Sequence, residues 1–227
     1  GDSDGARHWI ERAATAGDPF ARAQRAVWRL YGLHFPRDEA AAVLELETLL
    51  ETGGSPIAPS LLAVLHASGI GAPKDWRTAL NRLARGAASG DGRAMAQLAL
   101  LQPATADGAA RSAALLAHAG GAGFAPAAAI IGASGCAASG PPPAALLEDA
   151  ARAGEDPEAW KAPDAEIFCS RPRVDVFRGV APAAWRAYVM ALALPYLDPA
   201  QVQDVASGRA VQHRMRTNDI AIIDLWN

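Results

Sequence analysis

The sequence predicts a mainly α fold: a right-handed α-solenoid of helix-turn-helix repeats, followed by a small α+β segment. Glycine follows small or apolar residues at Gly17, Gly53, Gly90, Gly123 and Gly154, at intervals of 36, 37, 33 and 31 residues. Between these glycines, apolar residues recur at the three/four spacing of one helical face. A near-constant period in this range is typical of helical hairpins that stack on copies of themselves.

Composition is compatible with a globular protein and excludes several classes. The chain has 227 residues, of which 51% are hydrophobic, and a formal net charge of −3. It can therefore build a core, and it has no general attraction for nucleic acid or anionic membranes. No apolar run is long enough to span a membrane, and no secretory signal is visible, so we expect a cytoplasmic protein. Two cysteines, Cys136 and Cys169, are too few for a disulfide framework.

The clearest hairpin spans residues 58–90. Gly69 and Gly71 favour the end of a helix, Pro73 blocks its continuation, and Asp75 is the expected N-cap of the next helix. The apolar face is predicted to comprise Ala58, Leu61, Leu62, Leu65 and Ser68 before the turn, and Trp76, Ala79, Leu80, Leu83, Ala84 and Ala87 after it. A single hairpin cannot bury such a face, so it needs neighbouring hairpins.

The other units flank this hairpin. Residues 18–53 form a first unit with predicted core positions at Ala23, Val27, Leu30, Tyr31, Ala40, Val43, Leu44 and Leu50. Residues 91–123 and 124–154 form a third and a fourth unit, the fourth pairing AAAIIGASG with AALLEDAARAG. Their central turns are FPRD (35–38), APKD (72–75), ATAD (104–107) and GPPP (140–143). Residues 6–16 read as the second helix of a further unit, so we expect the native chain to start upstream.

These repeats resemble the Sel-one-like repeat (SLR), a relative of the tetratricopeptide repeat. The resemblance is carried by Ala23, Leu30, Tyr31, Gly32, Pro36 and Asp38, and by Leu62, Leu65, Gly69, Gly71, Pro73, Asp75, Ala79, Leu83, Ala87, Ala88 and Gly90. It covers roughly two thirds of the chain. It implies an α-solenoid whose concave face binds a protein or peptide, without chemistry of its own.

The pattern changes after Gly154. Residues 155–171 read as a linker that docks on the last repeat through Trp160. Residues 172–227 then form the α+β segment: a strand at 173–180, a helix at 181–197, short strands at 201–205 and 210–215, and an apolar run at 220–226. We therefore divide the chain into repeats (1–154), linker (155–171) and α+β segment (172–227).

No local motif for catalysis or metal binding is present. The histidines, His8, His34, His66, His118 and His213, lie far apart and form no HxD, HExxH or HxxxH spacing. His66 is expected to face a neighbouring helix or solvent. No Walker loop, GxGxxG or GxSxG motif occurs. A nucleophilic cysteine would need a histidine partner that the sequence does not identify.

One stretch carries a second resemblance. LDPAQVQDVASG (197–208) and HRMRTND (213–219), behind a strand and a helix, look like the opening of a prolyl 4-hydroxylase-like iron/2-oxoglutarate dioxygenase domain, which would make 172–227 an incomplete double-stranded β-helix domain. An Arg-Thr-Ser motif of that family is implicated in substrate binding. Arg216 and Thr217 match it, and Asn218 replaces the serine. The alternative is a surface Arg216 paired with Asp219 or Asp224.

The metal ligands of that family are missing from this chain. The sequence contains no His-x-Asp followed by a distal His, the triad that holds iron with open positions. Fe(II) and 2-oxoglutarate are therefore expected only for a longer parent protein, and this chain is not expected to be catalytic alone.

Two hypotheses follow. The first is the amino-terminal portion of an iron/2-oxoglutarate-dependent oxygenase, whose repeats bind a peptide or protein substrate and whose Arg216, Thr217 and Asn218 contact it. The second is a non-enzymatic repeat adaptor that recruits a protein partner on its concave face. Neither hypothesis involves nucleic acid or a membrane.

Overall fold

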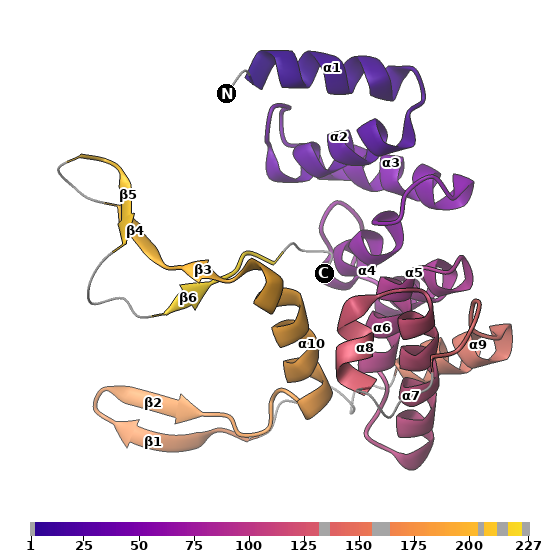
Figure 1. Ribbon diagram of the computed structural model, residues 1–227, viewed down its shortest axis with the longest axis vertical. Coiled ribbons are helices and arrows are strands. Elements are labelled where there is room, and N and C mark those ends of the chain that lie inside the picture. Colours follow the sequence, from indigo (N-terminus) through magenta and orange to yellow (C-terminus); the bar gives the residue numbers. More distant parts are fainter. Residues whose placement is uncertain (1–2, 132–136, 156–163, 204–206, 213–217, 224–227) are drawn as a thin grey trace.

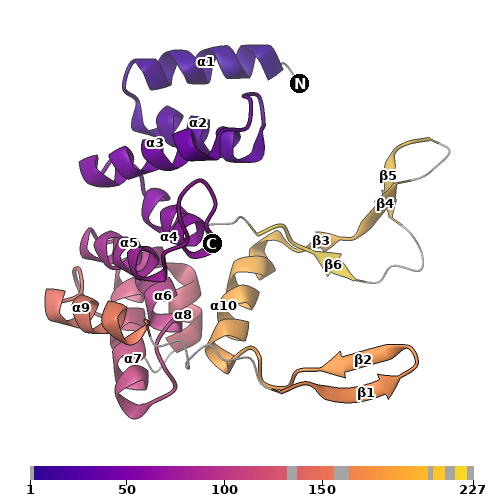
Figure 2. The ribbon, with the colours of Figure 1, turned by 180° about the vertical axis from the view of Figure 1, so that it is seen from behind.

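The structure, a computed structural model, describes residues 3–131, 137–155, 164–203, 207–212 and 218–223. Helices α1 to α9 stack in a column, α10 lies beside the lower part of that column, and the paired strands extend away from it (Figure 1). The view from behind shows α9 and α10 on opposite sides of the column (Figure 2). The described residues are mainly helical, as the sequence predicts, and form an α-solenoid followed by a small β segment.

The helices are α1 (Ser3–Thr15), α2 (Pro19–Tyr31), α3 (Glu39–Thr52), α4 (Ala58–Ser68), α5 (Trp76–Ala88), α6 (Gly92–Leu100), α7 (Ala106–Gly121), α8 (Ala125–Ile131), α9 (Ala144–Ala153), α10 (Ala183–Ala193) and the short 3-10 helix η2 (Leu194–Tyr196). The strands are β1 (Glu166–Ser170), β2 (Arg173–Val176), β3 (Asp198–Pro199), β4 (Gln201–Gln203), β5 (Ala210–Gln212) and β6 (Asp219–Ile220).

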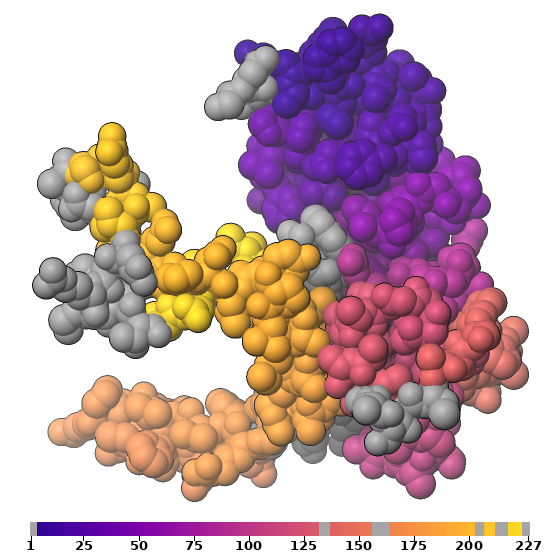
Figure 3. Space-filling view, viewed as in Figure 1, coloured from indigo at the N-terminus to yellow at the C-terminus, as the bar shows by residue number. Residues whose placement is uncertain are grey.

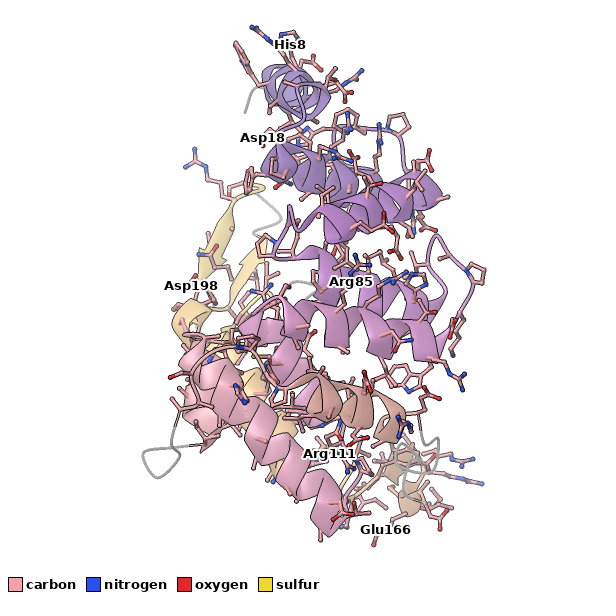
Figure 4. The ribbon with its side chains drawn as sticks, turned by 90° about the vertical axis from the view of Figure 1, so that its right-hand side faces the viewer. His8, Asp18, Arg85, Arg111, Glu166 and Asp198 are labelled. Atoms are coloured by element: carbon pink, nitrogen blue, oxygen red, sulfur yellow. The ribbon has the colours of Figure 1, made fainter. Side chains whose placement is uncertain are left out.

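Polar side chains cap several of the helices at their amino ends. The predicted cap at Asp75 is confirmed, because its Oδ1 accepts a hydrogen bond from the Thr78 backbone N–H at 3.1 Å. Asp18 (labelled in Figure 4) and Asp38 cap α2 and α3 in the same way. In the third unit Thr105, instead of an aspartate, caps α7. Each cap satisfies a backbone donor that the helix leaves unpaired.

The turn between α4 and α5 needs glycine for two reasons. Gly71 has φ 70°, and a Cβ there would lie 2.4 Å from the backbone oxygen of Glu39. The corresponding turn of the first unit has His34, which adopts φ 58° and packs its ring 4.3 Å, centroid to centroid, from that of Trp28. A non-glycine residue rarely adopts such a φ, so the first turn carries strain that the second avoids.

Buried apolar side chains form two clusters along the column. The first unites α2, α3 and α4, and the second runs from α4 and α5 through α9 and includes Tyr188 of α10. The largest fully buried side chains are Leu46, Leu49, Leu61, Leu62, Leu65, Leu80, Met95, Leu98 and Leu115. Four predicted core positions are wrong: Tyr31 is 48% exposed, Leu44 is 71% exposed, and Ala40 and Ser68 are exposed. Leu44 directly follows buried Val43, and adjacent helical residues point about 100° apart.

The fourth unit is not a hairpin of the predicted kind. Helix α9 packs mainly against α5, whereas α8 packs against α7 and α10. Two hydrogen bonds fix α9 there: the Trp76 indole N–H donates to the Gly154 carbonyl at 2.8 Å, and the Gln102 amide donates to the Ala150 carbonyl at 3.0 Å. The prediction that AAAIIGASG pairs with AALLEDAARAG is therefore wrong: α10, and not α9, packs on α8.

The β segment consists of three antiparallel pairs: β1 with β2, β3 with β6, and β4 with β5. The predicted strand beginning at Arg173 is confirmed as β2, and its partner β1 lies at Glu166–Ser170, within the stretch that was predicted to be a linker. Burial explains this error: Ile167 and Phe168 are 65% and 73% exposed, so the strand lacks the alternating apolar pattern that marks a half-buried strand. The predicted strands at 201–205 and 210–215 appear, in their described parts, as the β4–β5 pair.

Candidate functional site

The side of the column that faces α10 is the best candidate for a binding surface. Helix α10 packs on α8 and reaches α6, where the Trp185 indole N–H donates to the Leu100 carbonyl at 2.8 Å. Tyr188 is only 5% exposed, and its ring centroid lies 6.2 Å from that of Phe124. Trp185 and Tyr188 thus fix α10 on the solenoid. The space-filling view shows α10 in continuous contact with α8 (Figure 3).

A cavity of about 270 Å³, here called the α4–α10 cavity, opens between this helix and the column. Its described lining is Ala63, Val64 and Ala67 of α4, Trp76, Ala79, Leu80 and Leu83 of α5, Gln97, Leu100 and Leu101, and Trp185, Tyr188 and Val189 of α10. The wall is almost wholly apolar, and none of these residues carries a charge. Both indole N–H groups already donate to backbone carbonyls, so the tryptophans present mainly apolar surface.

A polar cluster lies beneath Tyr188. The Gln97 side chain lies beside the Tyr188 hydroxyl, with Asp91 and Arg93 close enough to act on it electrostatically. Burial raises the pKa of Tyr188 to about 12. Burial likewise raises the pKa of Asp91, whose Oδ1 caps α6 through the Arg93 backbone N–H at 2.9 Å. The Tyr188 hydroxyl of α10, which lies against this cluster, is therefore neutral at neutral pH.

A second set of charges has a structural role. Glu45 of α3 is 8% exposed and accepts from Arg22, Arg25 and Arg29 of α2, and Arg25 also bonds Glu11 of α1 at 2.8 Å. Hydrogen bonding to Glu45 raises the pKa of Arg25. These ion pairs tie three successive helices together and leave no group directed at a ligand.

The predicted substrate-binding residues are not brought into a site by the described structure. Arg216 and Thr217 lie outside the described residues. Asn218 is exposed, and its backbone carbonyl accepts from the Ala200 N–H at 3.0 Å, next to the β3–β6 pair. His66 contacts a neighbouring helix as predicted, with its Nε2 2.9 Å from the Glu47 Oε1.

Within the described ranges no three His, Cys, Asp or Glu side chains gather in a way that would hold a metal ion. In the same ranges, no helix is both long and apolar enough to cross a membrane.

Sequence reasoning found the aromatic face of α10 but not its partner. The sequence predicts Trp185, Tyr188, Val189 and Leu192 on one side of a helix. Trp185, Tyr188 and Leu192 contact the column, whereas Val189 is 51% exposed. Their spacing signals that this face is buried, but it contains no information about which surface buries it. For the same reason the α4–α10 cavity could not be predicted, because its walls come from stretches more than 100 residues apart.

The fold and this surface define the class of the protein: an α-solenoid of stacked helical hairpins that carries a further helix on one side. No family model matches the chain, and no curated protein matches it. Among solved structures, a Sel1 repeat protein from Oxalobacter formigenes aligns with 23% identity and a TM-score of 0.49, over 70% of this chain and 67% of that one.

A protective antigen of uropathogenic Escherichia coli that displays an SLR fold aligns with 18% identity and a TM-score of 0.45. The alignment covers 68% of this chain and 35% of that protein, so the chain spans about a third of its length. The assignment as an α-solenoid rests on the helix contacts of the chain itself.

Proposed function

We propose that the protein is a repeat scaffold that binds an apolar segment of a protein partner on the concave face of its solenoid. The observation that carries this proposal is α10, an apolar helix held on the column through Trp185 and Tyr188. A surface that holds one such helix within the chain has the chemistry to hold another, because apolar burial is not specific to covalent attachment.

The surface beside α10 has room for a further segment. Val64 and Ala67 of α4 line the α4–α10 cavity and are only partly covered, and Val189 of α10 is 51% exposed next to them. A bound helix or extended peptide would place apolar side chains there, as helix-in-groove complexes do. Charged ligands are disfavoured, because the lining has no charged side chain to pair with them.

The experiment is site-specific photo-crosslinking with the intact chain as bait. A photoreactive phenylalanine analogue replaces Val64, and as a matched control it replaces Thr48, an exposed residue of α3. We expect one protein to crosslink in stoichiometric amount at Val64 and not at Thr48. Equal crosslinking at both positions, or none at Val64, would contradict the proposal.

A second candidate function keeps the link to the iron/2-oxoglutarate oxygenases. It is favoured by the β segment, in which each described strand pairs with only one other strand and Ile167, Phe168 and Phe177 are 50% or more exposed. Such a segment is suited to packing against further strands of a double-stranded β-helix. In this proposal the parent protein binds Fe(II) and 2-oxoglutarate, and Arg216, Thr217 and Asn218 contact a peptide substrate.

The described residues do not fit the metal, since they bring no ligand cluster together, and we derive no chemical step through iron. The test is the parent reading frame: a His-x-Asp and a later His downstream are expected, and their absence would eliminate this candidate. Succinate release from 2-oxoglutarate should occur with the extended protein and be weakened by Arg216→Lys, which removes the planar fork of donors.

A further inference from the structure

We infer that the α4–α10 cavity binds a compact, uncharged aromatic molecule of about two fused rings. The inference concerns a small-molecule site, so it goes beyond the proposed binding of a protein partner. It rests on three properties of the cavity: the polarity of its wall, its volume and the aromatic residues that line it.

The wall offers water very little. Of its thirteen described residues only Gln97, Tyr188 and the two tryptophans carry polar side-chain atoms, and both indole N–H groups are already bonded to backbone carbonyls. A water molecule needs two to four polar partners to be held in a cavity. The cavity therefore favours an apolar occupant over water.

The volume sets the size of that occupant. An apolar cavity of about 150 Å³ stays dry and binds benzene. The α4–α10 cavity has a volume of about 270 Å³, and thus accommodates two fused rings instead of one. A larger ligand would leave part of its surface outside the cavity, since Trp185 and Tyr188 fix α10 to the column and limit its width.

The lining favours aromatic and uncharged ligands. Trp76, Trp185 and Tyr188 surround the space, and ring pairs in edge or offset contact gain attraction beyond simple burial. A carboxylate or ammonium group would lose its hydration without a charged partner, because the nearby Asp91 and Arg93 are not part of the wall. Gln97 is the single amide that a weakly polar ring atom can meet.

The experiment uses the intact chain with naphthalene and indole as probes and naphthalene-2-sulfonate as the charged control. We expect naphthalene and indole to raise the melting temperature in a saturable way, as any ligand that binds only the folded state does. We also expect both to shift the indole N–H resonances of Trp76 and Trp185, assigned from Trp→Phe variants. The sulfonate is expected to do neither.

Variants on α10 locate the site. Val189→Trp should fill the cavity from the α10 side and weaken naphthalene binding by at least about tenfold, since the ligand and the new ring compete for one space. Met190→Trp is the matched control, because Met190 is 58% exposed and does not line the cavity. Both positions are exposed enough for a larger side chain to leave the fold intact.

A second pair of variants approaches from the column. Ala67→Phe enters the cavity from α4, whereas Ala84→Phe, at another half-buried alanine on α5, points away from it. Binding should be lost only in Ala67→Phe. The inference is overturned if the wild-type chain binds neither neutral probe, if the sulfonate binds equally well, or if Val189→Trp and Ala67→Phe bind like their controls.

Discussion

The first two hairpins and the helices α8 to α10 are assembled differently. In α2–α3 and α4–α5 each helix packs on the next one in the sequence, with an aspartate cap at Asp38 or Asp75 and a left-handed glycine at Gly32 or Gly69. Around α8 the order is broken: α9 packs on α5, and α10 packs on α8. Helices α6 and α7 still pair locally, although their turn has neither a capping aspartate nor a glycine at positive φ. The comparison shows that turn chemistry favours local pairing of two helices but does not decide it.

The physical difference lies in the turn before the second helix. The turns before α3 and α5 have a capping carboxylate and a glycine at positive φ, which together fix the direction of the chain. The turn before α9 also has a glycine at positive φ, Gly140 at 77°, but it ends at Pro143, which makes no side-chain capping bond. This turn is held on α7 instead: the Ala138 N–H donates to the Ala117 carbonyl at 3.0 Å, and the His118 Nδ1 lies 2.9 Å from the Gly140 carbonyl oxygen. Helix α9 then packs on α5, where Trp76 and Leu80 contact Gly154.

The largest expected effect is on the docking of α10. Tyr188→Ala removes a buried ring and should destabilise the α10 contact by about 3–5 kcal/mol, as aromatic truncations in cores do. Hydrogen exchange should show faster exchange in α10 and α8, with the amides of α2 to α4 unchanged. Val189→Ala, at a 51% exposed neighbour, is the control and should change little. Uniform loss of protection along the column would show that the two regions are one cooperative unit.

The same tyrosine predicts a pH dependence. Its folded pKa of about 12 lies above the ordinary value of 10, so the folded state holds the proton more tightly. The raised pKa stabilises the folded state by up to about 2–3 kcal/mol. This stabilisation is fully present below pH 10 and is lost as pH rises through about 12. Urea unfolding of the wild type and of Tyr188→Phe at pH 9 to 12 measures this difference. If the free energy of unfolding changed equally with pH in both proteins, this prediction would be contradicted.

A smaller effect is expected in the regular region. Glu45→Gln leaves Arg22, Arg25 and Arg29 without their shared carboxylate. Because these arginines remain partly exposed, we expect a loss of about 2 kcal/mol, below the value for a fully buried pair. Thermal unfolding against Glu51→Gln, an exposed glutamate on the same helix, provides the control. Equal stability of the two variants would mean that the ion pairs contribute nothing measurable.

The smallest effect distinguishes two possible caps of α7. Thr105→Ala removes the side chain that accepts the Gly108 N–H at 3.1 Å and should cost about 1 kcal/mol. Asp107→Ala, at the aspartate of the predicted ATAD turn, should cost less than about 0.5 kcal/mol, because Asp107 only lies in the first turn of the helix. If chemical denaturation showed a larger loss of stability for Asp107→Ala than for Thr105→Ala, Asp107 would be the cap of α7, and the third unit would follow the aspartate pattern of the first two.

The sequence predicted the column well where local chemistry determines structure. Asp75 acts through the next few residues, and Gly71 in part through its own positive φ, so these roles are readable from spacing alone. The close approach of Glu39 to Gly71 is not, because it comes from another helix. The helix containing Trp185 and the strand beginning at Arg173 were found for the same reason. The strand β1 was missed because its exposed apolar residues, Ile167 and Phe168, give no alternating signal.

The binding surface could be predicted only in part. The apolar face of α10 was visible in the spacing of Trp185, Tyr188, Val189 and Leu192, yet the sequence did not show that it would pack on α8 while α9 packs on α5. That choice is a competition between distant apolar surfaces, which periodicity does not measure. The role of Arg216 stays a prediction, since the residue lies outside the described part of the chain.

The contact between α9 and α5 has a consequence for synthesis on the ribosome. The hydrogen bond from Trp76 to Gly154 joins residues 78 positions apart. At roughly 5–20 residues per second, the chain needs roughly 4–16 seconds to extend from one to the other. During that interval the α5 surface around Leu80 has no α9 to cover it, so a nascent chain exposes an apolar patch that a chaperone, or another nascent chain, can reach first.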